Sequence, residues 1–101
     1  MEISLAPIHE VRVNIAESFP PQVIIYIKGG LRDGCTSFHD LTIQQYGETI
    51  DIEVTTQHPR GVVCPAVYSY FEKNINLGSD FISGETYTIK VNDYITNFVM
   101  Q

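Results

Sequence analysis

The stretch Gly84–Asn92, with the sequence GETYTIKVN, alternates apolar and polar side chains through its second half. Tyr87, Ile89 and Val91 fall on one side of an extended chain, and polar residues fall on the other. A period of two is typical of a half-buried β-strand. The residue pair Asn92-Asp93 that follows is suited to a tight hairpin turn. The stretch therefore predicts a strand with one face in a core, followed directly by a hairpin partner.

The same alternation recurs outward along the chain, and no window of eleven residues shows a helical stripe of apolar residues. Gly29 and Gly30 are expected to end the second strand. Further strands are expected around Val11–Ile15, Val23–Ile27, Leu41–Ile43, Ile50–Val54, Tyr68–Leu77 and Tyr94–Met100. About seven short strands separated by turn residues predict an all-β, antiparallel two-sheet sandwich. We expect a single domain over residues 1–101.

The composition limits the classes of partner. The chain has 101 residues, of which 44% are hydrophobic and 18% charged, and its formal net charge is −6. An acidic surface repels phosphate backbones, so we expect no nucleic-acid partner. No apolar run approaches the roughly 20 residues that a membrane-spanning helix needs. Because residues 1–5 do not resemble a signal peptide, any export signal or lipid anchor is expected to lie outside this chain.

The two cysteines, Cys35 and Cys64, fall in turn-rich gaps at residues 29–37 and 57–65. If consecutive strands run up and down, both gaps and the Asn92-Asp93 turn lie at one end of the sandwich. We call this end, where both cysteines are expected, the stapled pole. The shared end predicts a disulfide between Cys35 and Cys64. A structural disulfide in turn favours an extracellular or cell-envelope location.

Gly84–Asn92 also resembles the penultimate strand of immunoglobulin-like and fibronectin type III sandwiches, in which a glycine and a tyrosine precede the alternating residues. This resemblance implies that Tyr87 forms a structural tyrosine corner, with its hydroxyl bonded to backbone. Together with Gly30–Thr36, Cys64 and Asn74–Leu77, the stretch is similar to small immunoglobulin-like modules of secreted prokaryotic proteins and lipoproteins. The resemblance covers about two-thirds of the chain, from Val23 onward, and implies a fold without implying an activity.

No motif with the spacing of a catalytic, cofactor or metal site is present. The histidines are dispersed and there is no CxxC pair, so we expect neither a metal site nor a cofactor, and no enzymatic activity. The histidines are His9, His39 and His58. Asp51 and Glu53 alternate with apolar residues and are expected to face solvent as solubilising charge.

One calcium alternative stays open from the sequence. Asp33, Asn92 and Asp93 would converge if all three lay at the stapled pole, where backbone carbonyls could complete a set of oxygen ligands. Their spacing is not that of an EF-hand.

These observations predict a non-enzymatic extracytoplasmic interaction, adhesion or spacer module at the cell envelope, with recognition in loops on a rigid scaffold. The expected protein-binding surface is the stapled pole, formed by Arg32, Asp33, Thr36, His58, Arg60 and Val62. The alternative is an extracellular protease inhibitor that presents the constrained loop 58–65. A third possibility is a carbohydrate-binding module that uses Tyr68 and Tyr70.

Overall fold

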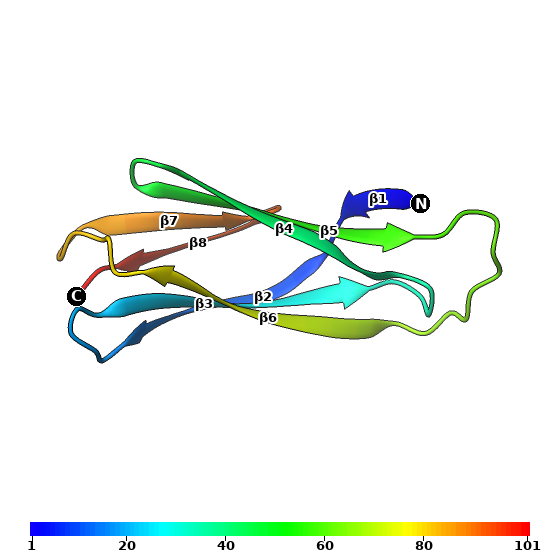
Figure 1. The fold of residues 1–101 in the computed structure, drawn as a ribbon, viewed down its shortest axis with the longest axis horizontal. Coiled ribbons are helices and arrows are strands. Elements are labelled where there is room, and N and C mark those ends of the chain that lie inside the picture. The colour runs from blue at the N-terminus through cyan, green and yellow to red at the C-terminus, as the bar shows by residue number, and fades with distance from the viewer.

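Strands alone form the regular structure of residues 1–101 in the computed structural model of this protein (Figure 1). They are β1 (Glu2–Leu5), β2 (Ile8–Ala16), β3 (Gln22–Leu31), β4 (Ser37–Tyr46), β5 (Thr49–His58), β6 (Ser69–Gly78), β7 (Thr86–Val91) and β8 (Tyr94–Val99). No helix capable of crossing a membrane is found. The all-β prediction is confirmed, with one strand more than expected. The additional strand is β1, a four-residue segment whose side chains are all exposed.

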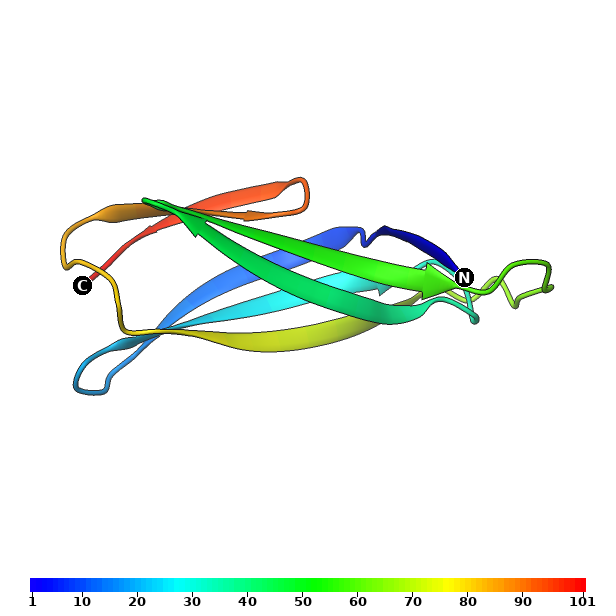
Figure 2. The ribbon, with the colours of Figure 1, turned by 45° about the horizontal axis from the view of Figure 1, so that its top comes forward.

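The strands form two layers, which separate clearly at the left of Figure 2, where β7 and β8 lie above the ends of β2, β3 and β6. One sheet has the order β2-β3-β6. In the other sheet, β4 lies along one edge of β5, while β1 and β7 share the opposite edge and β8 follows β7. The β5–β7 pair is parallel, and every other pair is antiparallel. The parallel pair arises because the chain leaves β5, runs back through β6 in the other sheet and then returns as β7.

The core lies between the layers and uses the predicted alternation. Val23, Ile25 and Ile27 of β3 are fully buried, as are Ile52 and Val54 of β5. The remaining buried apolar residues are Ala6, Val11, Ile50, Tyr87, Ile89, Val91 and Met100. Each fully buried aliphatic side chain stabilises the fold by about 1.5–3 kcal/mol relative to an exposed one. The core therefore holds the two sheets face to face.

Gly29 and Gly30 do not end the second strand, because β3 continues to Leu31. A Cβ atom on Gly29 would overlap the ring of Phe71, and one on Gly30 would overlap the hydroxyl of Tyr68. The two glycines lie on opposite faces of the strand and give room to two rings of the adjacent segment. Close approach of side chains, and not a turn, explains this glycine pair.

The Asn92-Asp93 turn joins β7 to β8 but does not reach the stapled pole. Within β5, only residues 49–52 pair with β7, so β7 ends before it reaches the stapled pole. The turn that follows β7 therefore lies part-way along the molecule (Figure 1). Asn92 has a positive φ of 52°, and its side chain bonds to three backbone groups. Its Oδ1 accepts from Val54 N at 2.9 Å, and its Nδ2 donates to Ala6 O at 2.8 Å and to Val54 O at 2.9 Å. On this edge of β5, β1 pairs with residues 55–58 and β7 with residues 49–52. The Asn92 side chain bonds to backbone groups in the gap between these two pairings.

Tyr87 is 4% exposed, and its ring stacks on Phe98 with 5.5 Å between centroids. Its hydroxyl accepts a hydrogen bond from Ile82 N at 2.8 Å, in the loop that precedes β7. This is the side chain to backbone contact that a tyrosine corner requires. The contact joins the start of β7 to the 79–85 connection, a segment at the end of the sandwich opposite the stapled pole (Figure 1).

Candidate functional site

Two connections between the sheets meet at the stapled pole. Residues 32–36 lead from β3 to β4, and residues 59–68 lead from β5 to β6 without regular structure. The predicted disulfide between Cys35 and Cys64 is confirmed, with 5.7 Å between the Cα atoms. Gly34 N also donates to Pro65 O at 2.9 Å. The two loops are therefore held together by one covalent bond and one backbone hydrogen bond.

Asp33 organises the shorter loop. Its Oδ1 accepts hydrogen bonds from Cys35 N, Thr36 N and Thr36 Oγ1, each at 2.9 Å. Its Oδ2 lies 2.9 Å from His58 Nε2. Partial desolvation by itself would raise the pKa of Asp33, but the hydrogen bonds from Cys35 and Thr36 and the charge of His58 outweigh it. The net result is a pKa below the ordinary value, so the carboxylate is ionised at neutral pH.

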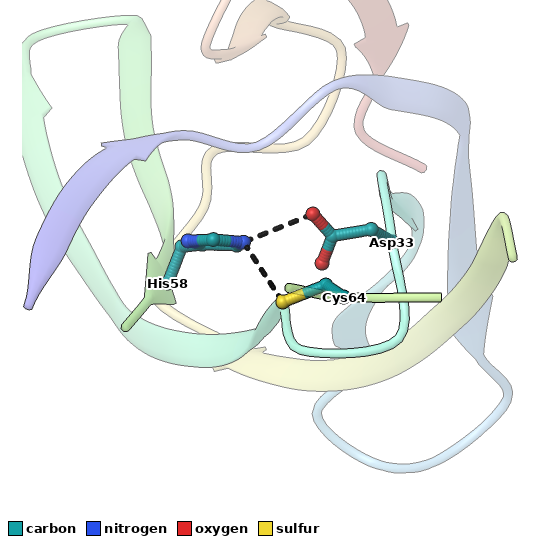
Figure 3. Close-up of side chains that lie close together, drawn as sticks. All are labelled: Asp33, His58 and Cys64. Atoms are coloured by element: carbon teal, nitrogen blue, oxygen red, sulfur yellow. Dashed lines mark hydrogen bonds and ion pairs between the residues drawn. The ribbon is translucent and has the colours of Figure 1, made fainter. Parts of the chain in front are cut away.

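His58, at the end of β5, connects this carboxylate to the disulfide. Its Nε2 lies 3.6 Å from Cys64 Sγ as well as beside Asp33 Oδ2 (Figure 3). One ligand-type atom from each of Asp33, His58 and Cys64 lies within 4.8 Å of the others. All three side chains are half-buried. This cluster was not predicted, because the spacings between its members, 25 and 6 residues, match no metal or catalytic motif. The one available signal was that all three residues were expected at the stapled pole.

The predicted contact residues divide into two groups. Asp33, Thr36 and His58 are half-buried and form the internal bonds of the pole. The exposed group consists of Arg32, Arg60 and Val62. A polar hollow of about 220 Å³ at this pole is lined by Glu2, Ser4, Arg32, Asp33, Thr36, Thr56 and His58.

The 59–68 loop presents apolar side chains to solvent. Val62 is 50% exposed and Val63 is 101% exposed, and Val67 is 59% exposed. Arg60 lies on the same loop, with its Nε 3.6 Å from Glu2 Oε1 of β1. The loop therefore presents an exposed apolar segment beside a cation, and the disulfide holds it on the sandwich.

Tyr68, the last residue of this loop, and Tyr70 of β6 form a second exposed group, called here the tyrosine face. Their rings meet edge to face with 5.4 Å between centroids, and His9 bonds to the Tyr68 hydroxyl. Lys28 Nζ lies 4.5 Å from the centroid of the Tyr70 ring. The tyrosine face therefore adjoins the stapled pole and is partly engaged by its own neighbours.

The remaining sequence candidates are not part of the Asp33–His58–Cys64 cluster. His39 Nδ1 is bonded to Thr55 Oγ1 at 3.0 Å, away from the cluster at His58. The convergence of Asp33, Asn92 and Asp93 does not occur, because Asn92 uses its amide on backbone groups and the turn lies part-way along the β5 edge. The calcium alternative loses its geometric basis. Asp51 and Glu53 line a polar hollow of about 230 Å³ with Thr42 and Gln44.

Together these features define a two-sheet β-sandwich whose loops are joined by a disulfide at one pole. Residues 25–100 match the family model of the ORF11 beta-sandwich domain, and the chain belongs to this family. It is 44% identical over 86 residues to the "Uncharacterized 10.2 kDa protein in HgiCIIM 5'region" of Herpetosiphon aurantiacus, a match that covers 85% of this chain and 90% of the relative.

Two further relatives come from the same organism, the uncharacterized 10.2 kDa proteins in the HgiBIM and HgiEIM 5' regions. Each is 46% identical over 76 residues, covering 75% of this chain and 92% of the relative. No solved structure matches the chain. The comparisons therefore assign a family and a sandwich fold.

Proposed function

We propose that this chain is a non-enzymatic interaction module of the cell envelope or extracellular space, and that it contacts a protein partner through the stapled pole. The observation that carries the proposal is the 59–68 loop, which exposes Val62 and Val63 while the Cys35–Cys64 disulfide holds it on the sandwich. A loop held in place loses less conformational entropy on binding than a free loop does.

The disulfide supports the extracytoplasmic location, because such bonds persist in oxidising compartments and are rare in reducing ones. The mixture of Arg60 with exposed valines favours a protein over a polyanion or a lipid surface. A sandwich that serves as a rigid support for binding loops also fits the immunoglobulin-like resemblance. Adhesion and spacing between further domains belong to the same class of function and use the same scaffold.

A photo-crosslinking amino acid at position 62 tests the contact surface in cells. Its matched control is the same amino acid at Ile82, which is 68% exposed and lies in the loop at the opposite end. We expect a partner protein to be captured from position 62 and not from position 82. Arg60→Ala and Val62→Ala should each weaken the captured interaction by more than about 1 kcal/mol, roughly fivefold. Capture from position 82 alone would place the contact at the end opposite the stapled pole and would contradict the proposal.

The alternative function is inhibition of an extracellular protease by the loop 58–65. It is favoured by the same constraint, since Pro59 and Pro65 and the disulfide limit the conformations of this segment. Residual activity of a panel of serine, cysteine and metalloproteases, measured with excess oxidised protein, tests it. Stoichiometric loss of activity that Val62→Ala relieves would favour inhibition.

A carbohydrate-binding function through Tyr68 and Tyr70 is the third candidate. The edge-to-face arrangement leaves 45% of Tyr68 and 54% of Tyr70 exposed, enough for a sugar ring to contact. A glycan array tests this function directly. Signals that vanish in Tyr70→Ala and persist in Val62→Ala would favour it over the protein-contact proposal.

A further inference from the structure

The cluster at the stapled pole contains side chains that can bind a metal, but its sulfur atom is in a disulfide and is not free to act as a thiolate ligand. Asp33 Oδ2 and Cys64 Sγ lie 2.9 Å and 3.6 Å from the same atom, His58 Nε2. Cys35 Sγ is covalently bonded to Cys64 Sγ but is not among the atoms that all lie within 4.8 Å of one another. One sulfur, one imidazole nitrogen and one carboxylate oxygen are thus gathered at one point, and a second sulfur is bonded to the first.

We propose that reduction of the Cys35–Cys64 disulfide converts this cluster into a tetrahedral zinc site with the ligands Cys35, Cys64, His58 and Asp33. The inference rests on the cluster alone and does not depend on the function proposed above.

The distances are close to those of a zinc tetrahedron. With Zn–N near 2.05 Å and Zn–S near 2.3 Å, the nitrogen and sulfur ligands of one zinc lie about 3.6 Å apart. The separation between His58 Nε2 and Cys64 Sγ is 3.6 Å. Nitrogen and oxygen ligands lie about 3.4 Å apart in the same geometry. The 2.9 Å between His58 Nε2 and Asp33 Oδ2 must therefore lengthen by only about half an ångström.

The sulfurs must separate further than the other ligands, since two thiolates on one zinc lie about 3.8 Å apart. Both cysteines lie outside the strands, in the loops 32–36 and 59–68. These loops can adjust without breaking a strand pair. His58 is the last residue of β5 and provides the fixed side of the site, whereas Asp33 belongs to the 32–36 loop and can adjust with it.

The chemistry of the step balances. A dithiol reductant passes two electrons and two protons to the S–S bond, which yields two thiols here and a disulfide in the reductant. Zinc then displaces both thiol protons, and the imidazole and carboxylate bind as neutral and anionic ligands. Thiolates and imidazole together favour zinc over the hard cations calcium and magnesium.

Metal titration of oxidised and reduced full-length protein tests the site. A phosphine reductant is used and removed by gel filtration, because thiol reductants themselves bind zinc. We expect one zinc per reduced chain and none per oxidised chain. With Co²⁺ as a probe, the reduced protein should show sulfur-to-cobalt charge-transfer bands and the intense visible bands of tetrahedral cobalt. Equal zinc binding by oxidised protein would overturn the proposal.

Variants separate this site from binding by two free thiols. Loss of a residue that merely orients a ligand weakens metal binding by about 10- to 100-fold, so His58→Gln should weaken zinc binding at least tenfold. Asp33→Asn should weaken it less, and His39→Gln, outside the cluster, should leave it unchanged. If reduction unfolds the chain, zinc should restore the dispersed amide NMR spectrum of the folded state. Unchanged affinity in His58→Gln, or failure of zinc to refold a reduced and unfolded chain, would refute the assignment.

Discussion

Replacement of Asn92 tests how much its side chain stabilises the gap between β1 and β7 on the edge of β5, which we call the seam. The Asn92 side chain makes three hydrogen bonds, to Val54 N, Val54 O and Ala6 O. Each is worth about 1 kcal/mol net, and orphaned backbone groups cost more where water cannot reach them. Asn92 is half-buried. We therefore expect Asn92→Gly, which keeps the positive φ accessible, to lower the free energy of unfolding by about 2–3 kcal/mol.

Two companion variants divide this loss into its parts. Asn92→Ala should cost about 1 kcal/mol more than Asn92→Gly, because an L side chain resists the left-handed conformation. Asn92→Asp keeps an acceptor for Val54 N but points a carboxylate at two carbonyl oxygens, so it should be at least as unstable as Asn92→Gly at neutral pH. Acid should restore part of that stability, because a protonated carboxyl can donate.

Urea denaturation of the oxidised protein, followed by circular dichroism, gives these free energies. Asn97→Ala is the matched control, since Asn97 is an exposed asparagine on β8, and it should change the free energy by less than about 0.5 kcal/mol. An Asn92→Gly variant as stable as Asn97→Ala would refute the reasoning, because the amide would then contribute nothing to the seam.

Three further predictions concern other packed groups. Tyr87→Phe should lower the free energy of unfolding by about 1 kcal/mol, measured by urea denaturation, because the bond to the preceding loop is lost. Gly29→Ala should cost about 1–3 kcal/mol by overlap with the Phe71 ring, and Phe71→Leu in the same chain should recover part of it. Partial desolvation and the hydrogen bond to Glu72 raise the pKa of Tyr26 in the folded state. The protonated Tyr26 side chain therefore contributes to stability below pH 10, and this contribution is lost as pH rises through the folded pKa. Thermal unfolding from pH 8 to pH 11 should therefore show a shallower alkaline decline in Tyr26→Phe than in the unmodified chain.

The sequence was most informative where side chains alternate. Ile50, Ile52 and Val54 are buried as expected, because a period of two places every second residue on the same face of a strand. β1 was missed because four exposed residues add nothing to the core pattern. The parallel pairing of β7 with β5 was also missed, since no local pattern reports which distant strand becomes the neighbour.

Local signals were misleading where tertiary contacts decide. Gly29 and Gly30 were interpreted as a strand end, whereas the rings across from them make the same residue type necessary inside the strand. The strand directions correctly brought Cys35 and Cys64 together. They gave no indication that His58 would turn its Nε2 toward both Asp33 and Cys64, because that depends on side-chain conformations at three separate loop and strand ends.

The disulfide has a mechanical consequence, because it joins two crossovers that each pass from one sheet to the other. At the stapled pole the layers are therefore linked by two chain segments and a covalent bridge. At the far end, the single crossover 79–85 is held by non-covalent contacts, namely the packing of Phe81, Tyr87 and Phe98 and hydrogen bonds such as that from Ile82 N to the Tyr87 hydroxyl. Local opening begins where constraints are fewest. Amide hydrogens of β7 and β8 near that end should exchange faster than those of β3 and β5 beside the disulfide. A pulling force should separate the two sheets first at the 79–85 crossover and last at the Cys35–Cys64 disulfide.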